Sequence, residues 1–173
     1  LRELMTDYGE VFEVWFDGAN GGDGWYGGAK ENRTIDRKNY YNYPEIYKML
    51  SELQPQAIIF SDGGPGCRWV GNEKGFAGAT NWSFLRTGEV FPGYEKYRTL
   101  QYGHADGDQW VAAECDVSIR PGWFYHPEED NQVKNVDQLT DLYYRSVGHN
   151  ATLLLNFPVD RNGLIHPIDS ANA

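Results

Sequence analysis

Apolar residues along the chain fall into two spacings, short continuous runs and longer segments with helical periodicity. Four short runs are apolar or rich in β-prone residues and predict buried strands at 11–16, 57–60, 110–116 and 151–156. Three segments repeat apolar residues every three or four positions and predict helices at 1–8, 44–53 and 137–147. Near-continuous apolar strands that are separated by helices predict an α/β fold with a parallel sheet.

The lengths of the predicted connections are asymmetric. Connections from helix to strand are short, as at 54–56, whereas those after the strands are long and hold most of the Trp, Asp, Glu, Arg and His residues. A (β/α)₈ barrel places its chemistry on the loops after the strands, and a doubly wound sheet has the same asymmetry. Because a closed barrel needs about 200 residues or more, residues 1–173 are expected to form only a portion of such a unit.

The net charge and composition of the chain favour some classes of binding partner and disfavour others. The chain has 25 Asp plus Glu against 15 Lys plus Arg, a formal net charge of -10, which disfavours nucleic acid or an anionic membrane and suits a neutral or cationic substrate. No apolar run approaches the roughly 18 residues of a membrane helix. Cys67 and Cys115 are far apart and are expected to be buried free thiols. The chain has 6 Trp and 12 Tyr, many of them in Gly-rich stretches. These aromatic residues either indicate a carbohydrate site or fill the core.

Two carboxylates stand out as candidates for chemistry. Asp17 directly ends an apolar strand, and Glu73 lies in a Gly-bounded aromatic segment that begins at Arg68. Retaining glycoside hydrolysis needs a nucleophile and a proton donor about 5–5.5 Å apart, and burial keeps the donor protonated by raising its pKa. With 25 acidic residues many pairs are possible, so the residues alone also allow Asp17 to turn the chain and Glu73 to be a solvated loop charge.

Four separate motifs, in the same order as in a known family, favour the catalytic interpretation. They are Glu13–Asn20, Arg68–Glu73, Glu114–His126 and Ser146–Asp160. Together they resemble glycoside hydrolase family 29, the retaining α-L-fucosidases, and the second resembles the branch that prefers α-1,3 and α-1,4 linkages. The resemblance implies that residues 1–173 are the C-terminal part of a (β/α)₈ (TIM-like) barrel, incomplete in this chain, and that the substrate is a fucosylated oligosaccharide or glycoconjugate.

The resemblance also assigns the catalytic roles. It implies that Asp17 attacks C1 of fucose as the nucleophile, and that Glu73 is the acid/base that protonates the leaving oxygen and then activates water. Trp15 and Trp123 are implied to stack on fucose, with Trp123 close to the methyl group. No metal or other cofactor is implied.

Two further residues have roles that stay open. Arg68 is expected either to bond a sugar hydroxyl or to hold a carboxylate charged, with a structural ion pair as the alternative. Glu114 is expected either to bind the leaving group or to be a structural acid.

The resemblance implies that the N-terminal barrel half, whose His, Trp and Tyr residues hold the fucose hydroxyls in the family, is not part of residues 1–173. We therefore expect a partner, either that half or a second copy of the chain. Members of this kind are commonly exported, which implies a secreted or periplasmic protein. A non-catalytic carbohydrate-binding protein and an inactive remnant on the same scaffold are the alternative functions.

Overall fold

A computed structural model describes residues 1–19, 21–28 and 30–173. Asn20, the last residue of the first motif, lies outside the described residues. The chain forms a mixed α/β structure around a curled parallel sheet of five strands, consistent with part of a TIM-like barrel. The sheet order is β1-β4-β5-β8-β9, and every neighbouring pair is parallel. The strand order never reverses, as a doubly wound sheet would require at its switch point, so the arrangement favours the barrel.

Each element has well-defined bounds. The sheet comprises β1 (Glu13–Trp15), β4 (Ile58–Ser61), β5 (Cys67–Trp69), β8 (Ala112–Ser118) and β9 (Ala151–Asn156). The helices are α1 (Arg2–Thr6), α2 (Tyr43–Leu53), α3 (Val136–Ser146) and α4 (Pro167–Asn172). Two antiparallel pairs lie outside the sheet, β2 (Gly22–Gly24) with β3 (Arg33–Ile35), and β6 (Phe84–Leu85) with β7 (Gln109–Trp110).

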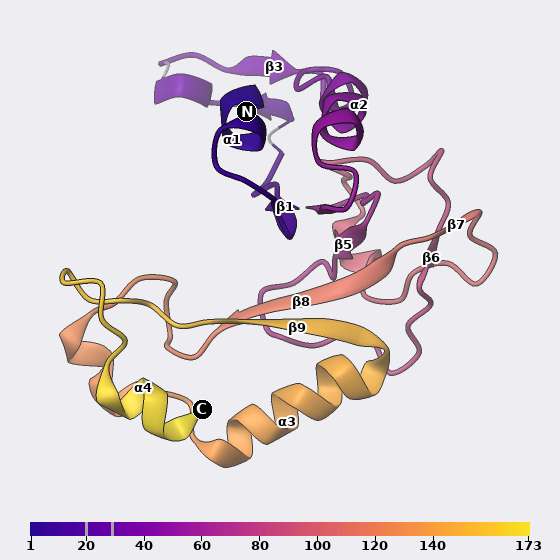
Figure 1. The fold of residues 1–173 in the computed structure, drawn as a ribbon. Coiled ribbons are helices and arrows are strands. Elements are labelled where there is room, and N and C mark those ends of the chain that lie inside the picture. Colours follow the sequence, from indigo (N-terminus) through magenta and orange to yellow (C-terminus); the bar gives the residue numbers. More distant parts are fainter. Residues whose placement is uncertain (20, 29) are drawn as a thin grey trace.

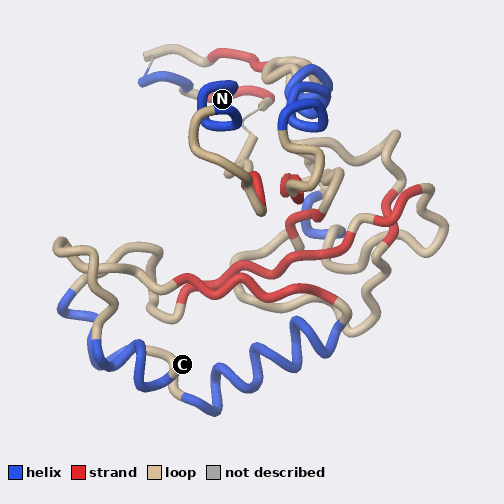
Figure 2. The backbone as a smooth tube through the Cα atoms, viewed as in Figure 1, coloured by secondary structure: helices blue, strands red, loops and turns tan. Residues whose placement is uncertain are grey.

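The helices pack on the sheet as their apolar stripes predict. α3 runs along β8 and β9, whereas α1 and α2 lie beside β1 (Figure 1; helices blue in Figure 2). Met5, Leu50 and Ile59 belong to the core cluster on the α1–α2 side. α3 begins with a capping box, in which Asn135 accepts from the Gln138 backbone N–H at 3.0 Å and the Gln138 side chain accepts from the Asn135 N–H at 2.9 Å. The three predicted helices and the four predicted strands are present. Two details of the prediction are wrong: Trp110 belongs to β7 and β8 begins only at Ala112, and β9, predicted to be buried, is only partly buried because it is an edge strand.

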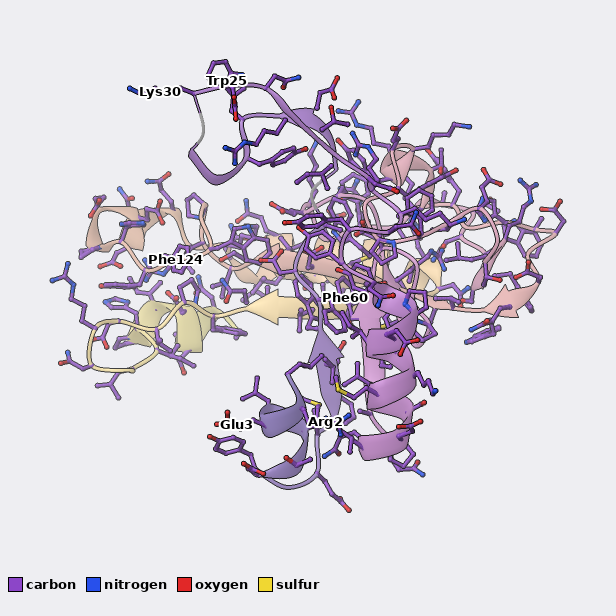
Figure 3. All side chains as sticks on the ribbon, turned by 90° about the horizontal axis from the view of Figure 1, so that it is seen from above. Arg2, Glu3, Trp25, Lys30, Phe60 and Phe124 are labelled. Atoms are coloured by element: carbon purple, nitrogen blue, oxygen red, sulfur yellow. The ribbon has the colours of Figure 1, made fainter. Side chains whose placement is uncertain are left out.

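The long loops contain structure that the patterns did not predict. β5 has only three residues and lies between Gly66 and Gly71, too short for a periodicity to be recognised. The β2–β3 pair forms an arm whose outer end carries Trp25 and Lys30, while Phe60 lies near the centre of the molecule (Figure 3). Within the described ranges no helix has the length and apolar character needed to cross a bilayer.

The sheet is open at both edges. β1 and β9 end the strand order, so each is hydrogen-bonded to one neighbouring strand only within the described residues. Phe12, just before β1, is 79% exposed. Unpaired strand edges and exposed apolar side chains are features that further chain normally covers.

Candidate active site

A cavity of about 710 Å³ lies where the carboxyl ends of neighbouring strands meet. It is lined by aromatic and acidic side chains that include Trp15, Asp17, Asp62, Trp69, Glu73 and Asp116. These residues belong to β1, β5 and β8 or to the loops that follow β1, β4 and β5. Parallel strands bring the residues after their carboxyl ends to one edge, which explains why positions so distant in the sequence converge.

The side chain of Trp15 is held on two sides. Trp15 and Phe60 are register partners on β1 and β4, and their rings stack at 4.1 Å between centroids with 5° between the planes. The Trp15 indole N–H donates to Glu114 Oε1 at 2.9 Å, and Glu114 Oε2 accepts from the Thr152 hydroxyl at 3.3 Å. Glu114 is therefore a buried support for Trp15 and lies outside the described lining of the cavity.

Trp69, the last residue of β5, is a second aromatic residue of the cavity lining. The Trp69 indole N–H donates to Asp116 Oδ1 at 2.8 Å, and the Trp69 ring stacks on Tyr97 at 5.5 Å and 21°. Asp116 is only 3% exposed. Burial raises the pKa of its carboxyl to about 6, against the opposing effect of the hydrogen bond from Trp69.

Asp17 and Glu73, the two predicted catalytic carboxylates, both line the 710 Å³ cavity, and both are solvent-exposed in this chain. Glu73 Oε2 accepts the indole N–H of Trp123 at 3.2 Å. This bond joins the loop after β5 to the loop after β8 and fixes Trp123 beside Glu73. The structure thus brings together Asp17, Glu73 and Trp15 in one cavity, with Trp123 in contact with one of them.

The Arg68 side chain lies outside the described lining of the 710 Å³ cavity. Its side chain is fully buried, and its guanidinium donates to the carbonyls of Leu100, Val111 and Trp82 and to Asn81 Oδ1. Neighbouring residues on a strand point to opposite faces, so Trp69 faces the cavity and Arg68 does not. Within the described residues Arg68 makes neither a contact with the cavity nor an ion pair with a carboxylate. It ties the long segment between β5 and β8 to the sheet.

One group of side chains beneath the cavity has the composition of a cation site. Single ligand atoms of Glu13, Cys67 and Glu114 all lie within 4.8 Å of one another, in the part of the chain that the structure describes. The Cys67 thiol donates to Glu13 Oε1 at 3.7 Å. Burial, followed by the proximity of Glu114, raises the pKa of Glu13. Each of the three side chains thus has a protein partner without a cation, Cys67 with Glu13, and Glu114 with Trp15 and Thr152. Both Cys67 and Cys115 are buried and free, as predicted.

Several lining residues escaped the sequence reasoning, although signals for two of them were present. Asp62 directly follows β4, much as Asp17 follows β1 after one residue, and it accepts the Gly93 backbone N–H at 2.7 Å. Asp116 lies two positions after Glu114 and therefore on the same face of β8. For Tyr97, in the irregular segment between β5 and β8, we find no sequence signal that marks it as part of the site.

Comparisons with known proteins agree on one family. A family model described as alpha-L-fucosidase matches residues 1–172. Alpha-L-fucosidase 1 of Arabidopsis thaliana is 45% identical over 98% of this chain, which spans 31% of that protein. Among solved structures, a glycoside hydrolase 29 family member from an unknown rumen bacterium is 58% identical with a TM-score of 0.85, over 99% of this chain and 30% of the other. A Ruminococcus gnavus GH29 fucosidase in complex with fucose is 31% identical with a TM-score of 0.68, over 92% of this chain and 31% of the other.

The chain therefore spans about a third of the length of these relatives. The match extends through essentially all of its residues, and the cavity lies where an enzyme of the barrel class would hold its substrate. This protein belongs to the alpha-L-fucosidase family of glycoside hydrolases, family 29.

Proposed function

We propose that residues 1–173 are the C-terminal part of the catalytic (β/α)₈ barrel of a retaining α-L-fucosidase that releases terminal α-1,3- or α-1,4-linked fucose from glycans. The observation that carries the proposal is the shared cavity, in which Asp17 and Glu73 lie with the aromatic faces of Trp15 and Trp69. Aromatic faces suit the apolar C–H face of a sugar ring. A fucosidase of the same family has been solved with fucose bound.

The proposed reaction is a double displacement. The Asp17 carboxylate forms a bond to C1 of fucose while the bond from C1 to the leaving oxygen breaks, and Glu73 gives that oxygen its proton. Glu73 then takes a proton from water, the water oxygen bonds to C1, and Asp17 leaves with the electron pair. The Trp123 indole N–H, 3.2 Å from Glu73 Oε2, stabilises the charged form of Glu73 between the two steps.

The open edges of the sheet supply the reason to propose a partner. Strands added beside β1 and β9 would pair the free edges and enclose the cavity. An N-terminal part of the barrel outside residues 1–173 is the proposed source of those strands, and a second copy of this chain is the alternative. Enclosure excludes water and strengthens the electrostatic contacts that the reaction needs. The protein is proposed to be secreted or periplasmic.

The test compares the full-length enzyme and residues 1–173 alone on an aryl α-L-fucoside and on a branched α-1,3/1,4-fucosylated glycan. Asp17→Ala and Glu73→Ala are the test variants, and Glu52→Gln, an exposed acid on α2, is the matched control. Asp17→Ala is expected to lower kcat by about 10³-fold or more, because no covalent intermediate can form. NMR of the first-formed product should show α-L-fucose. A β anomer, or full activity in Asp17→Ala, would refute the proposed mechanism.

The alternative function is a carbohydrate-binding protein or inactive fragment on the same scaffold. It predicts that fucose binds with unchanged affinity after loss of either carboxylate, and that neither substrate is turned over. Calorimetric titration of fucose into the wild type, Asp17→Ala and Glu73→Ala separates this outcome from catalysis.

A further inference from the structure

A second cavity, of about 750 Å³, adjoins the first and shares Trp69, Glu73 and Tyr97 with it. The rest of its described lining comes from the same stretch of chain, at Gly71, Asn72, Lys74, Phe76, Arg98 and Gln101. This stretch connects β5 to β8 in the middle of the sheet order, away from the open edges at β1 and β9. The cavity is thus built by this chain and does not depend on the strands that would complete a barrel.

The charge around this second cavity is opposite to that of the chain as a whole. Lys74 and Arg98 line it, both are exposed, and neither forms an ion pair within the described residues. Glu73 is the one acidic residue in its described lining. Two cations against one acid leave the described lining with a formal charge of +1 in a chain of net charge -10, and a local excess of positive charge favours an anion.

The position of Arg98 is set by a stack of planar groups. The Arg98 guanidinium carbon lies 5.8 Å from the centre of the Tyr97 ring, and Tyr97 in turn stacks on Trp69. Trp69 is anchored by its hydrogen bond to the buried Asp116. A guanidinium held on an aromatic face loses little entropy when it binds, and its planar fork matches the geometry of carboxylate and sulfate groups.

We propose that the second cavity binds the part of the glycan beyond the scissile bond, and that Arg98 and Lys74 select glycans carrying a carboxylate or sulfate on that part. The proposal rests on the proposed function, because Glu73 as acid/base would place the scissile oxygen at the boundary of the two cavities. Fucose occupies the first cavity, and the leaving sugar lies against Trp69 and Tyr97 in the second.

The experiment measures kcat/KM of the full-length enzyme on a neutral fucosylated trisaccharide and on its sialylated and sulfated forms. The wild type should prefer one or both anionic forms, and the form preferred identifies the anion. Arg98→Gln and Lys74→Gln should each lower the ratio of anionic to neutral kcat/KM by about tenfold, the effect of losing one charge-assisted contact. Lys96→Gln, an exposed neighbour outside the described lining, should leave the ratio unchanged.

Equal kcat/KM for the neutral and both anionic glycans, or a ratio unchanged in both Arg98→Gln and Lys74→Gln, would overturn the inference. Turnover of the neutral fucosylated trisaccharide by the wild type tests the proposed function separately, because that substrate carries no anion. Calorimetric titration of the neutral and anionic glycans into Asp17→Ala gives the same comparison by affinity, so the inference is tested even if no substrate is turned over. Equal affinities would then overturn it.

Discussion

Replacement of Arg68 by Met should destabilise the fold strongly without acting on the substrate directly. The guanidinium of Arg68 makes four hydrogen bonds to buried or half-buried acceptors. At about 1.5 kcal/mol each, the lower end for bonds to a charged group, they are worth about 6 kcal/mol. Burial lowers the pKa of Arg68 to about 10, which corresponds to a cost of about 3 kcal/mol for holding the charge. The expected net loss for Arg68→Met is therefore about 3 kcal/mol.

Urea unfolding followed by tryptophan fluorescence measures this loss as a lower midpoint with an unchanged slope. Arg68→Lys should recover little of it, because an ammonium group lacks the planar fork that reaches several acceptors. The control is Arg86→Gln on the same segment, whose ion pairs with Asp106 and Glu89 are exposed, and which should leave the midpoint almost unchanged. Wild-type stability in Arg68→Met, combined with a raised KM, would refute the structural role and restore the predicted contact with the sugar.

Three further outcomes are expected. Burial raises the pKa of Asp116 to about 6. Between about pH 4 and pH 6 the folded state therefore keeps a proton on Asp116 that the unfolded state has released. The free energy of unfolding falls as the pH rises through this range. Asp116→Asn keeps an acceptor for Trp69 and should therefore raise the melting temperature at about pH 7.5 but hardly at about pH 4; equal changes at both would contradict this. Cys67 and Cys115 are buried, and burial raises the pKa of both thiols, so iodoacetamide should label neither in native protein and both in urea; rapid native labelling would show that the site opens. Asn135→Ala removes the cap of α3 and should cost about 1 kcal/mol in urea unfolding, whereas Asn135→Asp, which keeps an acceptor oxygen, should cost much less.

Short-range patterns in the sequence were enough to locate several of the helices and strands and to indicate the family. Apolar runs of four to six residues were enough to locate β4, which is buried after its first residue, and β9, an edge strand that is only partly buried in this chain. Apolar residues at helical spacing were likewise enough to locate α2 and α3, because a helix that packs on a sheet needs an apolar stripe along one face. The motifs around Asp17 and Glu73 indicated the family that the whole-chain comparison then showed.

Tertiary structure alone decided what lies around those motifs. β5 is a strand only because β4 and β8 pair with it on both sides, and three residues carry too little local signal to predict that. Its alternation turns Trp69 towards the cavity and Arg68 into the protein, so two neighbours in one motif receive opposite roles. Tyr97 and Arg98 join the site only because a long segment folds back across β5. Such contacts depend on where distant parts of the chain meet, which short-range periodicity does not encode.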